Sequence, residues 1–216
     1  RPMPVKVVDA GVVAAYAVGH YQYGSSFFIK TDGSLWAMGL NNHGQLGDGT
    51  TEDRHSPVKV VDGGVIAVAT GFSHTLFLKE DGSVWAMGRN SYYNLGDGTN
   101  QNRHSPVKVV DSGVVAVAAA GAHSQIVKTD GSLWSVGAND FGQLGDGTNA
   151  DRNAWTKVLD TGVRDVAAEG PSVFVFADPN KAPTDLTLTP GTILENQPAG
   201  TIVGDLNASD TDAFLG

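Results

Sequence analysis

A repeat of 49 residues constrains the fold of this chain more than any other feature. The octapeptide DGSLWAMG begins at Asp32, returns as DGSVWAMG at Asp81 and returns again as DGSLWSVG at Asp130. The pentapeptide LGDGT keeps the same spacing and begins at Leu46, Leu95 and Leu144. A period of about fifty residues is typical of propellers and solenoids, in which each repeat buries its apolar face against the next one.

Within one period the sequence indicates four β-strands. Residues 64–71 form a short run of valine and alanine flanked by glycine, and residues 56–61 form a second short β-prone run. Residues 75–88 have the pattern of a hairpin, in which we expect Asp81 and Gly82 to take positive φ values in a type I′ turn. The 28 glycines also favour turns over helices. Four strands per period predict a propeller blade.

The phase of the repeat predicts an open arc of blades. Residues 1–14 match residues 54–67, so the chain begins at the arginine that opens the last strand of a blade. The pattern fades near residue 180, which corresponds to about 3.7 repeats. A closed ring needs its first and last blades to meet. We therefore expect an arc from a longer array, with open edges that promote self-association.

The repeat resembles that of a known family. Residues 64–99, followed by RHSPVKV, combine G-x-x-H, DGxxWxxG and LGDGT on one period. This combination closely resembles the bacterial branch of the regulator of chromosome condensation repeat family, over residues 1–178. The resemblance implies a seven-bladed β-propeller, of which this chain would supply about half. The predicted fold class is therefore all-β, a partial arc of about 3.7 four-stranded blades with an extended C-terminal tail.

Residues 179–216 leave the repeat and resemble the start of a bacterial cadherin-like domain. Residues 178–180 and Pro183 match that family's linker, and three carboxylates match its acidic motifs, namely Glu195, Asp210 and Asp212. The resemblance implies that these carboxylates are ligands of Ca²⁺, which prefers hard oxygen donors. Lys181 stands where the linker has an acid, and its charge would repel a metal. A tail of solvated acids without calcium is the alternative.

The polar sequence GQLGDGT suggests a metal or phosphate loop, but turn chemistry explains it better. One Asp per 49 residues does not supply the alternating acids of a calcium loop, and the sequence has no Gly-Lys-Ser/Thr ending. Asp-Gly pairs instead supply left-handed backbone and side-chain caps. The chain has no cysteine and no set of residues that stands out as a catalytic triad. We therefore predict no enzyme activity and, apart from calcium in the tail, no cofactor.

Several recurring residues are expected to be structural. His74 and His123 share a register that holds Ser172 in the last unit, so we expect hydrogen bonds to neighbouring backbone rather than a metal. The recurring tryptophans are expected to pack between blades, and they are Trp36, Trp85 and Trp134. A recurring arginine follows an aspartate by six residues, and we expect ion pairs from blade to blade for Arg54, Arg103 and Arg152.

The positions that differ between repeats are the most informative about partners. The loop that follows each tryptophan strand keeps its first asparagine and varies afterwards. Loops on a repetitive scaffold often carry recognition, and Tyr, Phe, His and Asn suit a protein interface. We predict partner binding by Asn42, His43, Ser91, Tyr92, Tyr93, Asp140 and Phe141. Neutral variation in exposed loops is the alternative.

Composition narrows the function further. The formal net charge of -9 argues against nucleic acid as a partner. The sequence contains no apolar run of about 18 residues, so we predict no membrane insertion. The leading hypothesis is a non-enzymatic protein-protein interaction module of a large secreted or cell-surface bacterial protein, with a role in adhesion. The alternative is a propeller-type inhibitor of a secreted enzyme such as a β-lactamase. A weaker alternative, implied by the family resemblance, is a guanine-nucleotide exchange factor.

Overall fold

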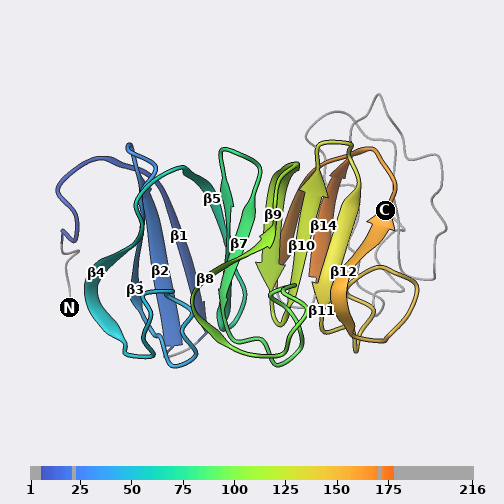
Figure 1. Cartoon of the computed structure of the whole chain (residues 1–216), viewed down its shortest axis with the longest axis horizontal. Coiled ribbons are helices and arrows are strands. Elements are labelled where there is room, and N and C mark those ends of the chain that lie inside the picture. The colour runs from blue at the N-terminus through green and yellow to red at the C-terminus, as the bar shows by residue number, and fades with distance from the viewer. Residues whose placement is uncertain (1–5, 21–22, 170–171, 178–216) are drawn as a thin grey trace, which may run out of the picture.

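The computed structural model describes residues 6–20, 23–169 and 172–177, and every regular element within these ranges is a β-strand (Figure 1). The first sheet contains β1 (Val12–His20), β2 (Tyr23–Lys30), β3 (Leu35–Gly39) and β4 (Arg54–Val61). The second contains β5 (Val65–Thr70), β6 (His74–Lys79), β7 (Val84–Gly88) and β8 (Arg103–Val110). The third contains β9 (Val114–Ala120), β10 (His123–Lys128), β11 (Leu133–Gly137) and β12 (Arg152–Leu159). A last pair contains β13 (Val163–Glu169) and β14 (Ser172–Ala177).

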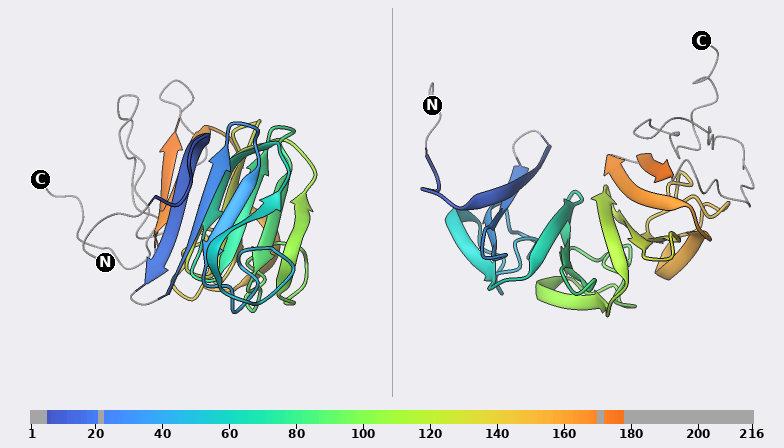
Figure 2. Two further views of the ribbon diagram at one scale, coloured as in Figure 1. Left: turned by 90° about the vertical axis from the view of Figure 1, so that its left-hand side faces the viewer. Right: turned by 90° about the horizontal axis from the view of Figure 1, so that it is seen from above.

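Each four-stranded sheet is one propeller blade. The strands of a sheet are antiparallel and pair in sequence order. Figure 2, in its view from above, shows the sheets along an arc, with β4, β8 and β12 on the convex side. These observations confirm the predicted four-stranded blades and the partial propeller.

Residues 6–9 align with the last strand of a blade but form no strand. The strand that would pair with them lies in no described part of the chain.

The hairpin turn inside each blade differs from the predicted type I′ turn. In the second blade the Gly82 N–H donates to the Lys79 carbonyl at 2.9 Å, and the Lys79 N–H donates to the Ser83 carbonyl at 3.0 Å. Gly82 has φ of 75°, whereas Asp81 stays at negative φ. This is a three-residue loop, a type I turn closed by one left-handed glycine. Asp81 acts through its side chain instead, since Oδ1 accepts from the Ser83 N–H at 2.9 Å and from its hydroxyl at 2.6 Å.

The same turn joins one blade to the next. The Gly82 carbonyl accepts from the Val114 N–H at 3.1 Å, across the boundary between the second and third blades. The equivalent bonds at the two other boundaries, Val65 to Gly33 and Val163 to Gly131, are both 3.0 Å. A Cβ atom on Gly82 would lie 2.8 Å from the Gly113 nitrogen. Glycine is therefore required for two reasons, its positive φ and the close approach of the next blade.

Apolar clusters fill the space between blades. Phe27 of the first blade belongs to one cluster with Phe77 and Met87 of the second blade. Trp85 is half-buried and packs against this cluster, and Trp134 packs in the same way against the cluster between the second and third blades. The prediction that the tryptophans pack between blades is confirmed for these two. Burial of large apolar side chains at each boundary supplies most of the stabilisation.

The first blade has an open side within the described chain. Val12 of β1 is 43% exposed, whereas the equivalent Val65 and Val114 are 2% and 4% exposed. The difference arises because no turn from a preceding blade covers Val12 in the described residues. This open side is the edge at which the sequence predicts self-association, and that remains a prediction.

Replacing Gly82 with alanine tests the blade-to-blade contact. Gly98 is a matched control, because its φ is 74° and a Cβ atom there would meet nothing within 4 Å. We expect Gly98→Ala to cost about 1–2 kcal/mol from left-handed strain alone. Gly82→Ala should cost about 1–3 kcal/mol more, because it also forces the two backbones apart. Urea unfolding of both variants measures the difference, and equal destabilisation would contradict the proposed role of the contact.

Candidate functional site

The long loops between the third and fourth strands are organised by a buried asparagine. In the second blade the Asn90 Oδ1 accepts from the Leu95 N–H at 3.0 Å, and its Nδ2 donates to Asp97 at 2.9 Å and to the Thr99 carbonyl at 2.7 Å. Asn41 and Asn139 make the same bonds in the other two loops. The prediction that LGDGT is turn chemistry is therefore confirmed.

The recurring ion pairs lie within blades and not between them. Arg103 Nε donates to Asp97 Oδ2 at 2.7 Å, and both residues belong to the second blade. The predicted blade-to-blade pairing is wrong because the loop folds back on the start of its own fourth strand, where Arg103 pairs with Gly88. Burial raises the pKa of Asp97, but hydrogen bonds from Arg103 and Thr99 outweigh it and hold that pKa below its usual range.

The metal prediction falls outside the described chain. Glu195, Asp210 and Asp212 all lie beyond residue 177, as does the rest of the tail. Among the described residues, no cluster of three or more His, Cys, Asp or Glu could hold a metal ion. Nor does the described part contain a helix long and apolar enough to cross a membrane.

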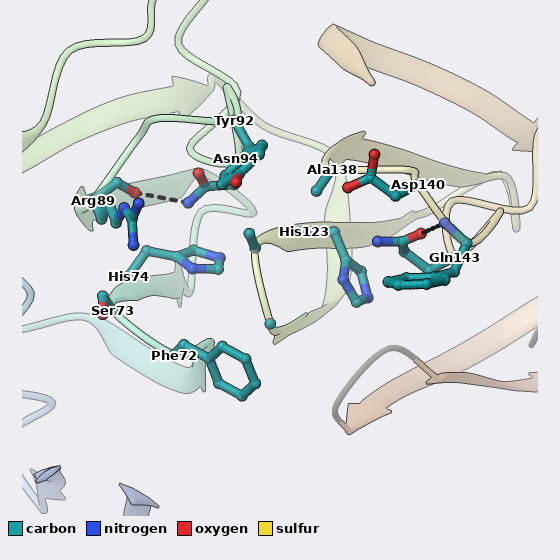
Figure 3. Close-up of a pocket in the computed structure, with 13 residues that line it drawn as sticks. Phe72, Ser73, His74, Arg89, Tyr92, Asn94, His123, Ala138, Asp140 and Gln143 are labelled. Atoms are coloured by element: carbon teal, nitrogen blue, oxygen red, sulfur yellow. Dashed lines mark hydrogen bonds between the residues drawn. The ribbon is translucent and has the colours of Figure 1, made fainter. Parts of the chain in front are cut away.

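A cavity of about 450 Å³ lies between the second and third blades (Figure 3). Its walls come from the β5–β6 turn and the β7–β8 loop of one blade, and from the β9–β10 turn and the β11–β12 loop of the next. These segments lie at one end of the sheets because the strands alternate in direction. The cavity therefore opens on the face that carries the long variable loops.

Aromatic side chains surround the opening of this cavity. Phe72 is 62% exposed, Phe141 is 61% exposed and Tyr92 is 39% exposed. The charged side chains Arg89 and Asp140 also line the opening, one from each blade, and both are exposed. Large apolar side chains are rarely this exposed without a reason when they gather in one place.

The floor of the cavity is polar, buried and incompletely hydrogen-bonded. Asn94 and His123 are each 1% exposed. The Asn94 Nδ2 donates to the Arg89 carbonyl at 2.7 Å, but among the described residues neither Asn94 Oδ1 nor His123 Nε2 has a partner. Buried polar atoms are usually paired, so both atoms depart from the usual hydrogen-bonding pattern.

The two buried histidines differ in their partners. Ser124 donates its hydroxyl hydrogen to the Asn94 carbonyl at 2.7 Å, so its oxygen accepts from His74 Nε2 at 2.9 Å. His74 therefore carries its proton on Nε2. One repeat later, Val173 stands where Ser124 stands, and His123 Nε2 loses the equivalent partner. The expected backbone partner is found for His74, whose imidazole also has a hydrogen bond to the backbone of His123. His123 Nε2 has no partner among the described residues.

Burial keeps both imidazoles neutral. Desolvation lowers the pKa of His74 to about 3, with a smaller contribution from His123, and desolvation lowers the pKa of His123 to about 4. Both values lie far below neutral pH. The floor of the cavity therefore carries no charge at pH 7, and its charges are confined to the opening.

The structure brings together three of the seven loop residues predicted to bind a partner. Tyr92, Asp140 and Phe141 line the cavity, and the other four do not. Ser91 accepts from Arg89 Nε at 3.1 Å and so orients a lining residue. Asn42, His43 and Tyr93 lie elsewhere on the loops. Asn42 Oδ1 accepts from Gln45, and burial followed by the nearby Arg89 lowers the pKa of His43.

The lining residues that the sequence prediction missed include Phe72, Arg89 and Asn94, although each departs from the repeat. Phe72 occupies the register of Gly121. Arg89 occupies the register of Leu40 and Ala138, and Asn94 occupies the register of Gln45 and Gln143. A comparison of every position across the three repeats, including turns, would have found them. Restricting attention to the three residues after the loop asparagine excluded them.

Comparison with known proteins identifies the repeat. The regulator of chromosome condensation (RCC1) repeat matches residues 32–78, 81–127 and 130–168, more than half of the chain, and a second form of the same repeat matches residues 65–94. Protein RCC2 homolog of Danio rerio is 42% identical over 55 residues, which are 24% of this chain and 11% of that protein.

Solved structures agree on the fold. Human WBSCR16 superposes with a TM-score of 0.62 at 26% identity, covering 72% of this chain and 43% of that one. Prp20p from Saccharomyces cerevisiae, described with its binding to Gsp1p and histones, gives a TM-score of 0.61 at 24% identity, covering 68% of this chain and 40% of that one. This chain therefore spans less than half the length of either of these two structures.

Tyr93 is strained, and relieving the strain should stabilise the protein. Its φ is 62°, at a position where the other blades have Gly44 and Gly142 with φ of 80° and 75°. Left-handed backbone costs a residue with a side chain about 1–2 kcal/mol, and asparagine tolerates it better than tyrosine. We expect Tyr93→Asn to raise the free energy of unfolding by roughly 1 kcal/mol in urea titrations. Tyr92→Asn is the control, and an equal gain there would remove strain as the cause.

The buried histidines should make the protein sensitive to acid. Their folded pKa values, about 3 and about 4, lie below the unfolded value of 6.5. Between these limits the unfolded chain binds more protons than the folded chain, so stability falls as pH drops below 6.5. Each histidine should remove about 1.4 kcal/mol per pH unit.

Urea unfolding from about pH 7.5 to about pH 4.5 measures this slope, because these values lie on either side of the unfolded histidine pKa of about 6.5. A variant with serine at both positions, His74→Ser with His123→Ser, is the control, because serine occupies this register at Ser25 and Ser172. Its free energy of unfolding should change much less over the same range. The unfolded histidine pKa is about 6.5. A wild-type free energy of unfolding that stays constant from about that pH down to about pH 4.5 would contradict the neutral, buried state of the histidines.

Proposed function

Because the chain belongs to the regulator of chromosome condensation (RCC1) repeat family, we propose that it is a non-enzymatic protein-binding propeller whose contact surface surrounds the cavity between the second and third blades. The repeat supplies a rigid scaffold, and the departures from it supply recognition. Phe72, Arg89, Tyr92 and Asn94 all depart from the repeat, and all four line this cavity.

The observation that carries the proposal is the ring of exposed aromatic side chains. Phe72, Tyr92 and Phe141 come from two blades and three connections, yet they surround one opening. Aromatic residues and arginine are enriched at the centres of protein interfaces, where each buries a large area. Arg89 and Asp140 at the same opening give the surface both signs of charge for orienting a partner.

A binding role suits the chemistry of the cavity better than catalysis. His74 and His123 have pKa values near 3 and 4, so neither is a proton-transfer group at neutral pH. His74 already uses its Nε2 proton in a hydrogen bond to Ser124. The cavity therefore offers surfaces and hydrogen bonds to a partner.

We propose further that the parent protein is secreted or displayed on a bacterial surface, where it takes part in adhesion. The support is the sequence resemblance of the tail to a cadherin-like domain and the acidic, cysteine-free composition.

Inhibition of a secreted enzyme such as a β-lactamase would use the face that carries the cavity. The inhibitor alternative predicts that the purified chain blocks hydrolysis by the enzyme, and the exchange-factor alternative predicts faster nucleotide release from a small GTPase.

The test of protein binding is a cross-linking capture with three baits. The first is the wild-type chain, and the second is Phe72→Ser with Tyr92→Ser and Phe141→Ser. The third is Ile66→Ser with Val115→Ser, which removes half-exposed apolar side chains at equivalent positions of β5 and β9. Baits are exposed to extracts and culture medium of the source organism, and captured proteins are quantified by mass spectrometry.

We expect one or more proteins to bind the wild type and the third bait but to be depleted at least tenfold on the second. Loss of aromatic contacts at the centre of an interface often costs about 2 kcal/mol or more, which exceeds a tenfold change in affinity. Equal capture by the second and third baits would exclude the aromatic ring as the contact surface.

A further inference from the structure

Arg89 is an unpaired arginine on the face that carries the long loops. In each long loop an aspartate pairs with the arginine that begins the following strand, and the pairs are Asp48 with Arg54, Asp97 with Arg103, and Asp146 with Arg152. Arg89 instead follows β7 directly, and it forms no ion pair with a described residue. Its Nε donates to the Ser91 hydroxyl at 3.1 Å, so both terminal nitrogens of the guanidinium remain available.

Asp140 is an unpaired charge of the opposite sign. It lies in the β11–β12 loop at the register of Ser91, and its side chain is exposed. Within the described part of the chain it forms no ion pair, and Asn149 donates to its backbone carbonyl and not to its carboxylate. The carboxylate of Asp140 is therefore available to a cation from another molecule.

The cavity lies between these two charges. Figure 3 shows Arg89 among residues of the second blade, on one side of the cavity, and Asp140 among residues of the third blade, on the other. The backbone is fixed on both sides, since the Arg89 N–H donates to the Ser73 carbonyl at 2.8 Å and the Ala138 N–H donates to the Ala122 carbonyl at 3.0 Å. This boundary therefore presents a positive and a negative side chain that do not neutralise each other.

The opening between the charges is apolar, and its backbone is held in place. The Phe72 N–H donates to the Gly121 carbonyl of the next blade at 3.0 Å, and the Phe141 N–H donates to Gln143 Oε1 at 2.9 Å. A cavity of about 450 Å³ has room for one large side chain. Clefts lined by aromatic side chains favour apolar groups, so the residue that enters this cavity is apolar.

A partner that covers the opening removes Arg89 and Asp140 from water. A charge that is buried without a counter-charge is costly, so the partner must bring a group of opposite sign to each of them. The terminal nitrogens of Arg89 suit a carboxylate, which can accept from both at once. Asp140 suits the ammonium or guanidinium of a basic side chain. A wholly apolar partner would leave both charges uncompensated.

We propose that this cavity binds a segment of the partner protein in which an apolar residue is flanked by an acidic residue, paired with Arg89, and a basic residue, paired with Asp140. The apolar residue enters the cavity among Phe72, Tyr92 and Phe141. The proposal rests on the protein-binding function proposed above and names the chemistry of the segment that the surface recognises.

The test uses acetylated, amidated tripeptides with a central leucine. The flanking residues are a glutamate and a lysine in either order, two glutamates, two lysines, or two glutamines as the neutral reference. Amide chemical shifts of the full chain are followed by NMR, and dissociation constants on the order of millimolar are expected for ligands of this size. The tighter of the mixed tripeptides should bind roughly fivefold more tightly than the neutral one, because each exposed ion pair contributes modestly. The largest shifts should fall on residues 72–74, 89–92 and 138–143.

Two charge reversals locate the contacts. Arg89→Glu leaves acids on both sides of the cavity, so the tripeptide with two lysines should become the tightest ligand. Asp140→Lys leaves cations on both sides, so the tripeptide with two glutamates should become the tightest. Glu52→Lys is the matched control, because it changes the net charge as much as Asp140→Lys does, at an exposed position of the first blade. It should keep the preference for a mixed tripeptide. All three side chains are exposed, so loss of folding is not the expected cause of a change.

Equal binding of the mixed and neutral tripeptides, or absence of shifts at the cavity, would overturn the inference. So would a preference that Arg89→Glu and Asp140→Lys leave unchanged, or one that Glu52→Lys alters as much as Asp140→Lys does, because overall charge would then be the cause. These outcomes are separate from the capture experiment. Partner capture that depends on the aromatic ring, together with no charge preference, would leave the binding function standing and reject only the flanking charges.

Discussion

The close contact between the Asp-Gly turn of one blade and the first strand of the next is the constraint on which the rest of the structure depends. The Gly82 carbonyl accepts from Val114, and Gly82 lies too close to the Gly113 backbone to carry a Cβ atom. The same geometry at Gly33 and Gly131 sets the same spacing at each boundary. Because this end of each blade is held rigidly to the next, the loops at the opposite end are also held at a defined separation. The cavity exists because neighbouring loops cannot collapse onto each other.

Most of the fold follows from periodicity, because a repeated pattern identifies each strand several times. The four strands per period, the glycine turns and the packing of Trp85 and Trp134 between blades were all predictable. Two local features were not. The turn type depends on the loop length between the last paired residues, Lys79 and Ser83, which the Asp-Gly pair alone does not reveal. Spacing also shows that Arg103 and Asp97 recur together, but it does not show that the loop returns to its own blade.

The candidate site was predicted only in part, for a physical reason. Loop variation pointed to Tyr92, Asp140 and Phe141, which the structure places around one opening. Phe72 was overlooked because it lies in a turn between strands that otherwise belong to the scaffold. The orphan atoms of Asn94 and His123 could not be predicted, because a missing hydrogen bond depends on burial and, for His123, on a partner from the next blade. Such pairs are separated by about one period along the chain and meet only once the blades are stacked.

The repeat also shows how the boundary that carries the cavity differs from the one before it. There, Thr75 donates to the Gln45 carbonyl at 3.0 Å, and the longer Gln45 side chain caps the His43 N–H, so the floor has its hydrogen bonds. At the second boundary Ser124 keeps the equivalent bond to the Asn94 carbonyl, which preserves the blade spacing. At the loop position itself Asn94 replaces the glutamine of the other blades, and its Oδ1 is left without a partner among the described residues. Recognition in such a scaffold can therefore arise by removing an internal hydrogen bond while the backbone bonds that hold the blades together remain intact.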